Sequence, residues 1–274
     1  MADLSWSASA SWLARGNPRL TSLFRTFDEA RWRAPSYCPG WTAAHVVSHM
    51  TSGARFYRGV IENGRKGLLA PPFGAKDIPE FRAIRAKQME ELLALPGAAR
   101  ADRFEEAVGA LQRTLESLMP HELDLPGWHP RCPTPLRNFP DQRLYELILH
   151  EWDIRNEPES PLASPALGAA VEILKERLPF LWENTEHPRM DGRFRFETSA
   201  PVAAWEVETR GDKAALFKDQ NGRCDARLSA TASDMILLVC GRAPIAERRR
   251  AGRLLVDGDQ AKADVLIESL FRPY

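Results

Sequence analysis

The sequence lacks the features that several common classes of protein require. Its four cysteines, Cys38, Cys132, Cys224 and Cys240, lie far apart and form no Cys-x-x-Cys pair. A disulfide scaffold is therefore not expected, and we expect reduced, mostly buried thiols. No apolar run is long enough to cross a bilayer, and the N-terminus has no basic region followed by an apolar core. We therefore expect a cytoplasmic protein that is not bound to a membrane.

An excess of charge and the common nucleotide-binding motifs are also absent. Lys+Arg and Asp+Glu both number 37, so no global field would draw the chain to nucleic acid. The phosphate-binding patterns Gly-x-x-x-x-Gly-Lys and Gly-x-Gly-x-x-Gly do not occur, and neither does the Gly-x-Ser-x-Gly turn of serine hydrolases. In this neutral context the run Arg248-Arg249-Arg250 is interpreted as a solvated turn. Small molecules are thus the expected partners, and the pattern gives no oligomeric state.

The first two thirds of the chain have helical periodicity, with apolar residues at near-helical spacing. Six prolines between residues 120 and 140 exclude a continuous helix there, and a segment of that length often covers or lines a site. Thr42 is a good N-cap for the second helix. The expected helices cover residues 9–30, 43–63, 77–95, 100–119, 141–156 and 164–186.

After residue 187 the pattern changes to short alternating segments. Residues 194–198 and 204–209 alternate apolar and polar side chains, as half-buried strands do. Helices followed by mixed strands and helices predict two domains, a helical domain of residues 1–187 and an α+β domain of residues 192–274. Further strands are expected at residues 214–218, 224–230 and 254–256, with helices at 234–241 and 260–271.

Glu146-x-x-x-His150 is the first candidate for a functional site. Residues four apart share one face of a helix, so these two side chains can bind one ion together. The helix is apolar on almost every side, and a carboxylate buried there is costly unless a metal or an arginine neutralises it. A second helix could bring in His49 as a third ligand. Three protein ligands would leave a tetrahedral metal with one open position, as in catalytic zinc sites.

Two further polar residues have more than one interpretation. His45 could be a fourth ligand, a capping-box partner of Thr42, or a contact to a ligand or substrate. Asp153 could orient a metal ligand or anchor an arginine, or it could lie on the helix surface, paired with Arg155 or Arg143. We favour His49 as the ligand, with His45 outside the metal's ligand set.

These segments together resemble a known family. Pro39-Gly40-Trp41-Thr42, His49 and Glu146-x-x-x-His150-Glu151-Trp152-Asp153 resemble the mycothiol-dependent maleylpyruvate isomerase family, within the DinB-like superfamily. Residues 228–242 and 256–259 resemble the C-terminal domain of that family, which is similar to sterol carrier proteins. The resemblance implies a DinB-like four-helix bundle followed by a smaller α+β sterol-carrier-like domain. One departure is His45, because the family usually has an acidic residue there.

The same resemblance implies a cofactor and a cosubstrate. Zinc would be bound by His49, Glu146 and His150, and mycothiol would be the thiol cosubstrate. Arg242 matches an arginine that helps to close the cleft between the domains. Other cationic partners for an acidic substrate would be Arg82 or Arg85.

Zinc in an open site deprotonates a coordinated thiol, whose ordinary pKa is about 8.5. Addition of the thiolate to a conjugated double bond, followed by rotation and elimination, would give cis–trans isomerisation. Displacement of a leaving group would instead give a thioether. The departure at His45 favours the second outcome, so S-transfer is the expected activity and maleylpyruvate isomerisation is the alternative. A small-molecule or lipid carrier with a structural metal, and an iron-dependent oxidoreductase, remain as other classes.

Overall fold

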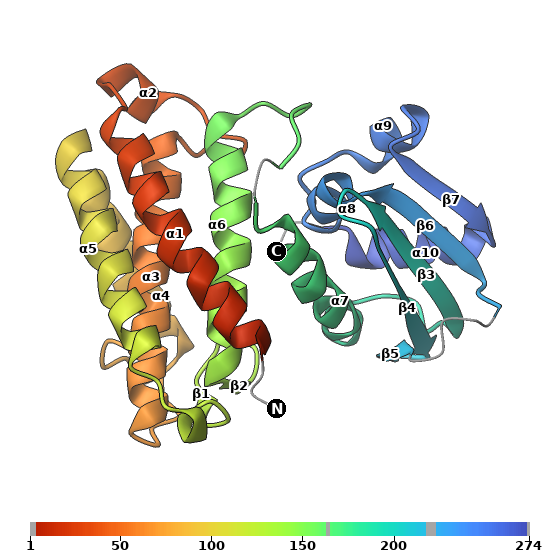
Figure 1. Ribbon diagram of the computed structural model, residues 1–274, viewed down its shortest axis with the longest axis horizontal. Coiled ribbons are helices and arrows are strands. Elements are labelled where there is room, and N and C mark those ends of the chain that lie inside the picture. Colours follow the sequence, from red (N-terminus) through yellow and green to blue (C-terminus); the bar gives the residue numbers. More distant parts are fainter. Residues whose placement is uncertain (1–3, 163–164, 218–222, 273–274) are drawn as a thin grey trace. The chain divides into compact units, whose positions relative to one another are not determined.

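The computed structural model describes residues 4–162, 165–217 and 223–272. It divides the chain into two compact units, with the division between Glu157 and Pro158. The first unit is helical and the second is built on a sheet (Figure 1). This is the expected fold class, a helical N-terminal part followed by an α+β part. Among the described helices, none has the length and apolar character that a bilayer crossing requires.

The first unit is a bundle of four long helices. Helix α3 packs against α5 and α6, and α1 packs against the same two (Figure 1). Two further helices accompany the bundle, α4 alongside α3 and the short α2 before it. The bounds are α1 Leu4–Arg25, α2 Glu29–Arg33, α3 Ala43–Arg65, α4 Ile78–Leu93, α5 Gly97–Glu116 and α6 Phe139–Arg155.

The proline-rich segment between α5 and α6 is ordered and packs against α3 and α4. Its strands β1 (Pro126–Gly127) and β2 (Thr134–Pro135) pair between the 3-10 turns η1 (Pro120–Glu122) and η2 (Leu136–Asn138). The Trp128 ring lies 5.0 Å from the Phe81 ring and 6.3 Å from the Phe56 ring, measured between centroids. The segment therefore covers one side of α3 and α4.

The second unit is a five-stranded sheet with helices packed against it. The strand order is β5-β4-β3-β6-β7, and β3 and β6 are parallel while the other neighbours are antiparallel. Alternation in β3 buries Phe194 and Phe196, as the sequence pattern predicts. Helices α7, α8 and α10 contact the strands. The bounds are α7 Leu167–Glu183, β3 Gly192–Ser199, β4 Ala203–Arg210, β5 Lys213–Phe217, β6 Ala226–Thr231, α8 Ala232–Val239, α9 Ile245–Arg250, β7 Leu254–Gly258 and α10 Gln260–Leu270.

The boundary between the units differs from the one expected at residues 187–192. Helix α7 belongs to the second unit, where it packs against β4, β5, α8 and α10. Its apolar face, including Leu174, Leu178 and Trp182, is buried, and the Trp182 indole donates to the Gly211 carbonyl at 3.3 Å. Periodicity predicts the helix but not which neighbour covers it. Ser164 and Lys218, expected at the ends of a helix and a strand, lie outside the described residues.

Two smaller expectations were wrong. Arg248 is no part of a solvated turn, because it lies in α9 and is 3% exposed. The cysteines are free, as expected, but only Cys240 is buried, while Cys132 is exposed. Hydrogen bonds compensate the burial of the Arg248 guanidinium group, which donates to Glu159 at 2.7 Å and to the Pro158 carbonyl at 2.7 Å.

The position of α7 gives a direct prediction about fragments of the chain. Residues 158–274 expressed alone should fold cooperatively, whereas residues 188–274 should not, because removing α7 exposes the apolar surface that it covers. Far-UV circular dichroism with urea unfolding measures this. An equally cooperative transition for the shorter fragment would contradict the division between Glu157 and Pro158.

Candidate metal centre

Helices α3 and α6 bring the predicted histidines together. The rings of His49 on α3 and His150 on α6 lie 4.9 Å apart between centroids, in an edge-to-face arrangement. Glu146 lies one turn before His150 on the same helix. The Trp41 ring, 5.3 Å from the His49 ring, covers this histidine from the loop before α3. The three predicted ligands thus lie in one region of the bundle, between two packed helices.

His49 is held as a neutral imidazole. Burial, and to a lesser degree the electrostatic effect of neighbouring His150, lowers the pKa of His49 from 6.5 to about 3. A neutral imidazole has a lone pair on one ring nitrogen, the form that binds a metal. Within the described part of the chain, no hydrogen bond is recorded to either nitrogen of His49.

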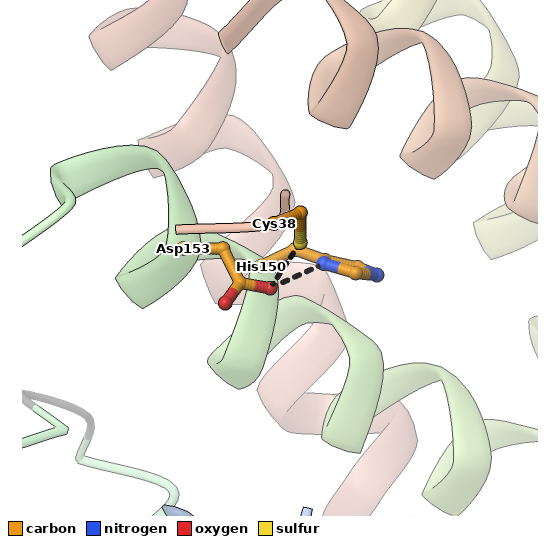
Figure 2. Close-up of side chains that lie close together, drawn as sticks. All are labelled: Cys38, His150 and Asp153. Atoms are coloured by element: carbon orange, nitrogen blue, oxygen red, sulfur yellow. Dashed lines mark hydrogen bonds and ion pairs between the residues drawn. The ribbon is translucent and has the colours of Figure 1, made fainter. Parts of the chain in front are cut away.

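His150 is oriented by the buried carboxylate of Asp153. Nδ1 of His150 lies 2.9 Å from Oδ2 of Asp153, and the Asp153 residue is 0% exposed. Because an ionised carboxylate only accepts hydrogen bonds, Nδ1 carries the proton and Nε2 keeps the lone pair. Figure 2 shows the second ring nitrogen pointing away from Asp153. Arg155, which could have paired with Asp153, instead donates to Glu151 at 2.7 Å.

Glu146 has a cationic partner in the protein. Its Oε2 accepts from Nη1 of Arg143 at 3.3 Å, and its Oε1 accepts from the Tyr57 hydroxyl at 3.1 Å. Burial alone would raise the pKa of Glu146, but the combined electrostatic effect of Arg143, His49, His150 and Arg85 outweighs it and the pKa is lowered. Gly53 on α3 leaves room for this pair, since a Cβ there would lie 3.1 Å from Nη1 of Arg143. These contacts favour the ionised carboxylate, and because 31% of the Glu146 side chain is exposed, burial does not by itself argue for a metal.

The closest set of potential ligands differs from the predicted one. Within the described residues, Cys38, His150 and Asp153 form one group whose ligand atoms all lie within 4.8 Å of one another. The ligand atoms of His49, Glu146 and His150 are not that close together. In the Cys38 group, however, the Cys38 thiol and the His150 ring both donate to Oδ2 of Asp153 (Figure 2). Those contacts are satisfied as hydrogen bonds and need no ion.

The residues fit a divalent metal by the chemistry of their donor atoms. Two neutral imidazoles and one carboxylate suit zinc or non-haem iron(II). The Nε2 lone pair of His150 is not used by Asp153. Each oxygen of Glu146 accepts one hydrogen bond and has a second lone pair. Zinc remains the preferred ion, and its identity stays a prediction.

The other predicted site residues have separate places. His45 completes a capping box, because its Nδ1 accepts from the Thr42 backbone N–H at 3.2 Å. An acidic side chain at this position would make the same bond, so the departure from the family pattern has a structural explanation. Arg82 is exposed on α4, whereas Arg85 on that helix is half-buried and donates to the Ser52 hydroxyl at 3.2 Å.

Arg242 belongs to the second unit. It follows α8 directly after Gly241, whose positive φ of 63° ends the helix. Its Nη1 donates to the Cys240 carbonyl at 3.1 Å. A contact of Arg242 with the substrate stays a prediction.

Sequence reasoning missed the residues that hold the candidate ligands. Arg143 had a readable signal, because it lies three residues before Glu146 and so on the same helix face. Tyr57 and Cys38 had none, since they reach Glu146 and Asp153 from distant parts of the sequence. Tertiary contacts of this kind are invisible in helical spacing.

The lowered pKa of His49 predicts how stability depends on pH. Between pH 3 and 6.5 the unfolded chain binds a proton at His49 that the folded chain does not, so the free energy of unfolding falls as the pH falls through this window. The loss is at most about 1.4 kcal/mol per pH unit. Urea unfolding of the metal-free proteins at pH 4.5 and pH 7 measures this. The free energy of unfolding should depend less steeply on pH in His49→Gln than in the wild type. An equal pH dependence of the free energy of unfolding in the wild type and in His49→Gln would contradict a neutral His49.

The four-helix bundle holds two imidazoles and a carboxylate between α3 and α6, and an α+β unit follows it. These features define a class of two-domain proteins with a candidate metal centre in the helical part. The chain belongs to the mycothiol maleylpyruvate isomerase N-terminal domain family, whose model matches residues 13–155. That match covers three of the bundle helices in full and most of α1, including every predicted metal ligand. A search of curated proteins gives no match.

Two solved structures of one isomerase share the fold of this chain. A crystal structure of a histidine-to-alanine mutant of the mycothiol-dependent maleylpyruvate isomerase matches with a TM-score of 0.63 and 13% identity, over 92% of each chain. A second crystal structure of that isomerase matches with a TM-score of 0.60 and 14% identity, over 87% of this chain and 90% of the other. Sterol carrier protein 2 like 2 from Aedes aegypti matches 37% of this chain and 97% of its own, with 19% identity and a TM-score of 0.31.

Proposed function

We propose that this protein is an enzyme that uses a low-molecular-weight thiol, mycothiol, at a divalent metal held by His49, Glu146 and His150. The observation that carries the proposal is the meeting of His49 and His150 between α3 and α6, 4.9 Å apart between ring centroids, with Glu146 one turn away. Metal binding would need side-chain rotations that draw the three sets of ligand atoms closer together. Membership of the mycothiol maleylpyruvate isomerase N-terminal domain family supports the thiol requirement.

Each residue has a defined part in this proposal. Bound zinc would supply Lewis acidity that lowers the pKa of a coordinated thiol. His49 offers a lone pair without first losing a proton, because its pKa is already about 3. Asp153 would keep the proton of His150 on Nδ1, and Arg143 together with the other cationic groups nearby favours the ionised form of Glu146. These contacts hold the donor set in its binding form at neutral pH.

Arg85 is suited to bind a carboxylate of the second substrate. Its guanidinium lies 5.7 Å from the Phe56 ring centroid and 5.8 Å from that of Phe81, and its Nε donates to Ser52. These contacts fix the plane of the group and leave its outer N–H groups for a ligand. Arg85 also acts electrostatically on His49 and Glu146, so the cation lies near the proposed centre. An anionic, electrophilic acid is the substrate class that this arrangement favours.

Reversible addition is the outcome we propose for the thiolate. Addition to a conjugated cis double bond, rotation about the resulting single bond and elimination would return the thiol and give the trans acid. The capping role of His45 removes the reason for preferring S-transfer, because that preference rested on the departure at this position. S-transfer also begins with attack of the thiolate on carbon, but there the bond to a leaving group breaks, the leaving group departs, and the thiol sulfur stays in the product as a thioether.

Liquid chromatography, which separates the cis and trans acids of equal mass, coupled to mass spectrometry of the products tests the proposal. The zinc-loaded protein would be incubated with mycothiol and maleylpyruvate, and separately with a panel of other electrophiles. We expect the trans isomer of maleylpyruvate with the mass of mycothiol unchanged. A stable thioether would establish S-transfer instead. The absence of any thiol-dependent product, together with no thermal stabilisation by mycothiol, would favour a small-molecule or lipid carrier.

The proposed role of Arg85 can be separated from that of its neighbour Arg82. Arg85→Gln should raise KM for the acidic substrate about 10- to 100-fold, the loss of one charge-assisted pair, with the zinc content unchanged. Arg82→Gln, on the same helix but exposed, is the matched control and should keep the KM of the wild type. Similar KM values for both variants would show that Arg85 does not bind the acidic substrate.

A further inference from the structure

Asp153 is a buried carboxylate, and the proposed function does not explain all of its contacts. Its Oδ2 lies 2.9 Å from His150 Nδ1 and 3.3 Å from Cys38 Sγ. A carboxylate that is 0% exposed needs donors to offset the cost of leaving water. In this pair of contacts Cys38 must be the donor, because an ionised carboxylate cannot donate.

The position of Cys38 is fixed by the loop between α2 and α3. The Tyr37 backbone N–H donates to the Asp153 carbonyl at 2.8 Å, and the Tyr37 ring lies 4.6 Å from the Trp152 ring. The Cys38 N–H donates to the Ser36 hydroxyl at 3.2 Å. The residue before Cys38 thus ties the loop to the C-terminal part of α6, and the contact with Ser36 holds Cys38 within the loop. The loop therefore holds the Cys38 thiol against Oδ2 of Asp153.

This contact bears on the tautomer of His150. Oδ2 holds the imidazole proton on Nδ1 only while the carboxylate keeps its position and stays an acceptor. A second donor on the same oxygen fixes that position, so that Nε2 faces away with its lone pair (Figure 2). Partners of this kind change metal affinity by about 10- to 100-fold when removed.

We propose that Cys38 is a positioning residue for the candidate metal centre, acting through Asp153 to keep His150 in the Nδ1–H tautomer. This rests on the proposed function in that His150 is taken as a metal ligand. Cys38 itself stays a protonated thiol outside the metal's ligand set.

The test compares Cys38→Ala with Cys38→Ser, using Cys132→Ala as the control for an exposed cysteine. Zinc affinity, measured by chelator competition, should fall about tenfold in Cys38→Ala and stay within about threefold of the wild type in Cys38→Ser, whose hydroxyl can donate to Oδ2. Nitrogen NMR of the metal-free protein at pH 8 should show the Nδ1–H tautomer of His150 in the wild type and Cys38→Ser. A mixture of tautomers is expected in Cys38→Ala.

Two results would overturn the proposal. One is an unchanged zinc affinity together with an unchanged His150 tautomer in Cys38→Ala. The other is a thiolate-to-cobalt absorption band in the Co²⁺-loaded protein that Cys38→Ser abolishes, because this would make Cys38 a ligand. The NMR measurement needs no metal. If the wild type binds no zinc, the proposed function fails while the tautomer still decides the role of Cys38.

Discussion

Replacing His150 by alanine should abolish metal binding and lower kcat/KM by about a thousandfold or more. The change removes one of three proposed protein ligands and leaves Asp153 without its imidazole partner. A loss of about 4 kcal/mol of transition-state stabilisation corresponds to this factor, which is in the range expected when the Lewis acid of a site is lost. Metal analysis and initial rates with mycothiol and maleylpyruvate measure it.

His121→Ala is the matched control for this experiment. His121 lies exposed in the 3-10 turn η1 and is not one of the proposed ligands. The control should keep the metal content and the rate of the wild type, and circular dichroism should show that both variants are folded. Wild-type rates in His150→Ala would contradict the proposed role of this residue.

The second large effect is expected on stability, at Asp234 in the second unit. Its carboxylate is 2.7 Å from Nη2 of Arg253 and 3.5 Å from Nε of Arg248, and its side chain is 3% exposed. Breaking a buried ion pair typically costs about 3–5 kcal/mol, and here it would leave the charge of buried Arg248 facing Glu159, whose side chain is 74% exposed. Asp234→Ala should therefore lower the free energy of unfolding by about this amount.

Asp264→Ala serves as the control for a more exposed pair. Asp264 pairs with Arg249 at 2.6 Å, with 47% of the Asp264 side chain exposed, so its loss should cost less than about 1 kcal/mol. Denaturation of residues 158–274 expressed alone measures both variants. Equal losses for the two aspartates would contradict the burial-based account of the Asp234 cluster.

Much of the secondary structure could be predicted because its signals are local. The periodicity that predicts a helix over residues 141–156 corresponds to α6, Phe139–Arg155, and the alternation over residues 204–209 corresponds to β4, Ala203–Arg210. The domain boundary could not be predicted in this way. An amphipathic helix such as α7 has the same period in a bundle as on a sheet, and only its tertiary neighbours place it in the second unit.

The candidate site, like the fold, could be predicted where its signals are local in the sequence. The spacing of Glu146 and His150 and the resemblance at His49 indicate side chains that the structure brings to facing helices. The sequence left open whether a metal or an arginine neutralises Glu146, and the structure brings Arg143 within hydrogen-bond distance of it. Contacts such as Cys38 with Asp153, 115 residues apart, depend on how a loop folds onto α6 and leave no periodic signal.

Anomalous X-ray diffraction at the zinc absorption edge, from crystals of the zinc-loaded protein, tests the central claim most directly. The account predicts one strong peak about 2.0–2.2 Å from a His49 nitrogen, a Glu146 oxygen and Nε2 of His150. A peak bounded instead by Cys38, Nδ1 of His150 and Asp153, or no peak between α3 and α6, would contradict it.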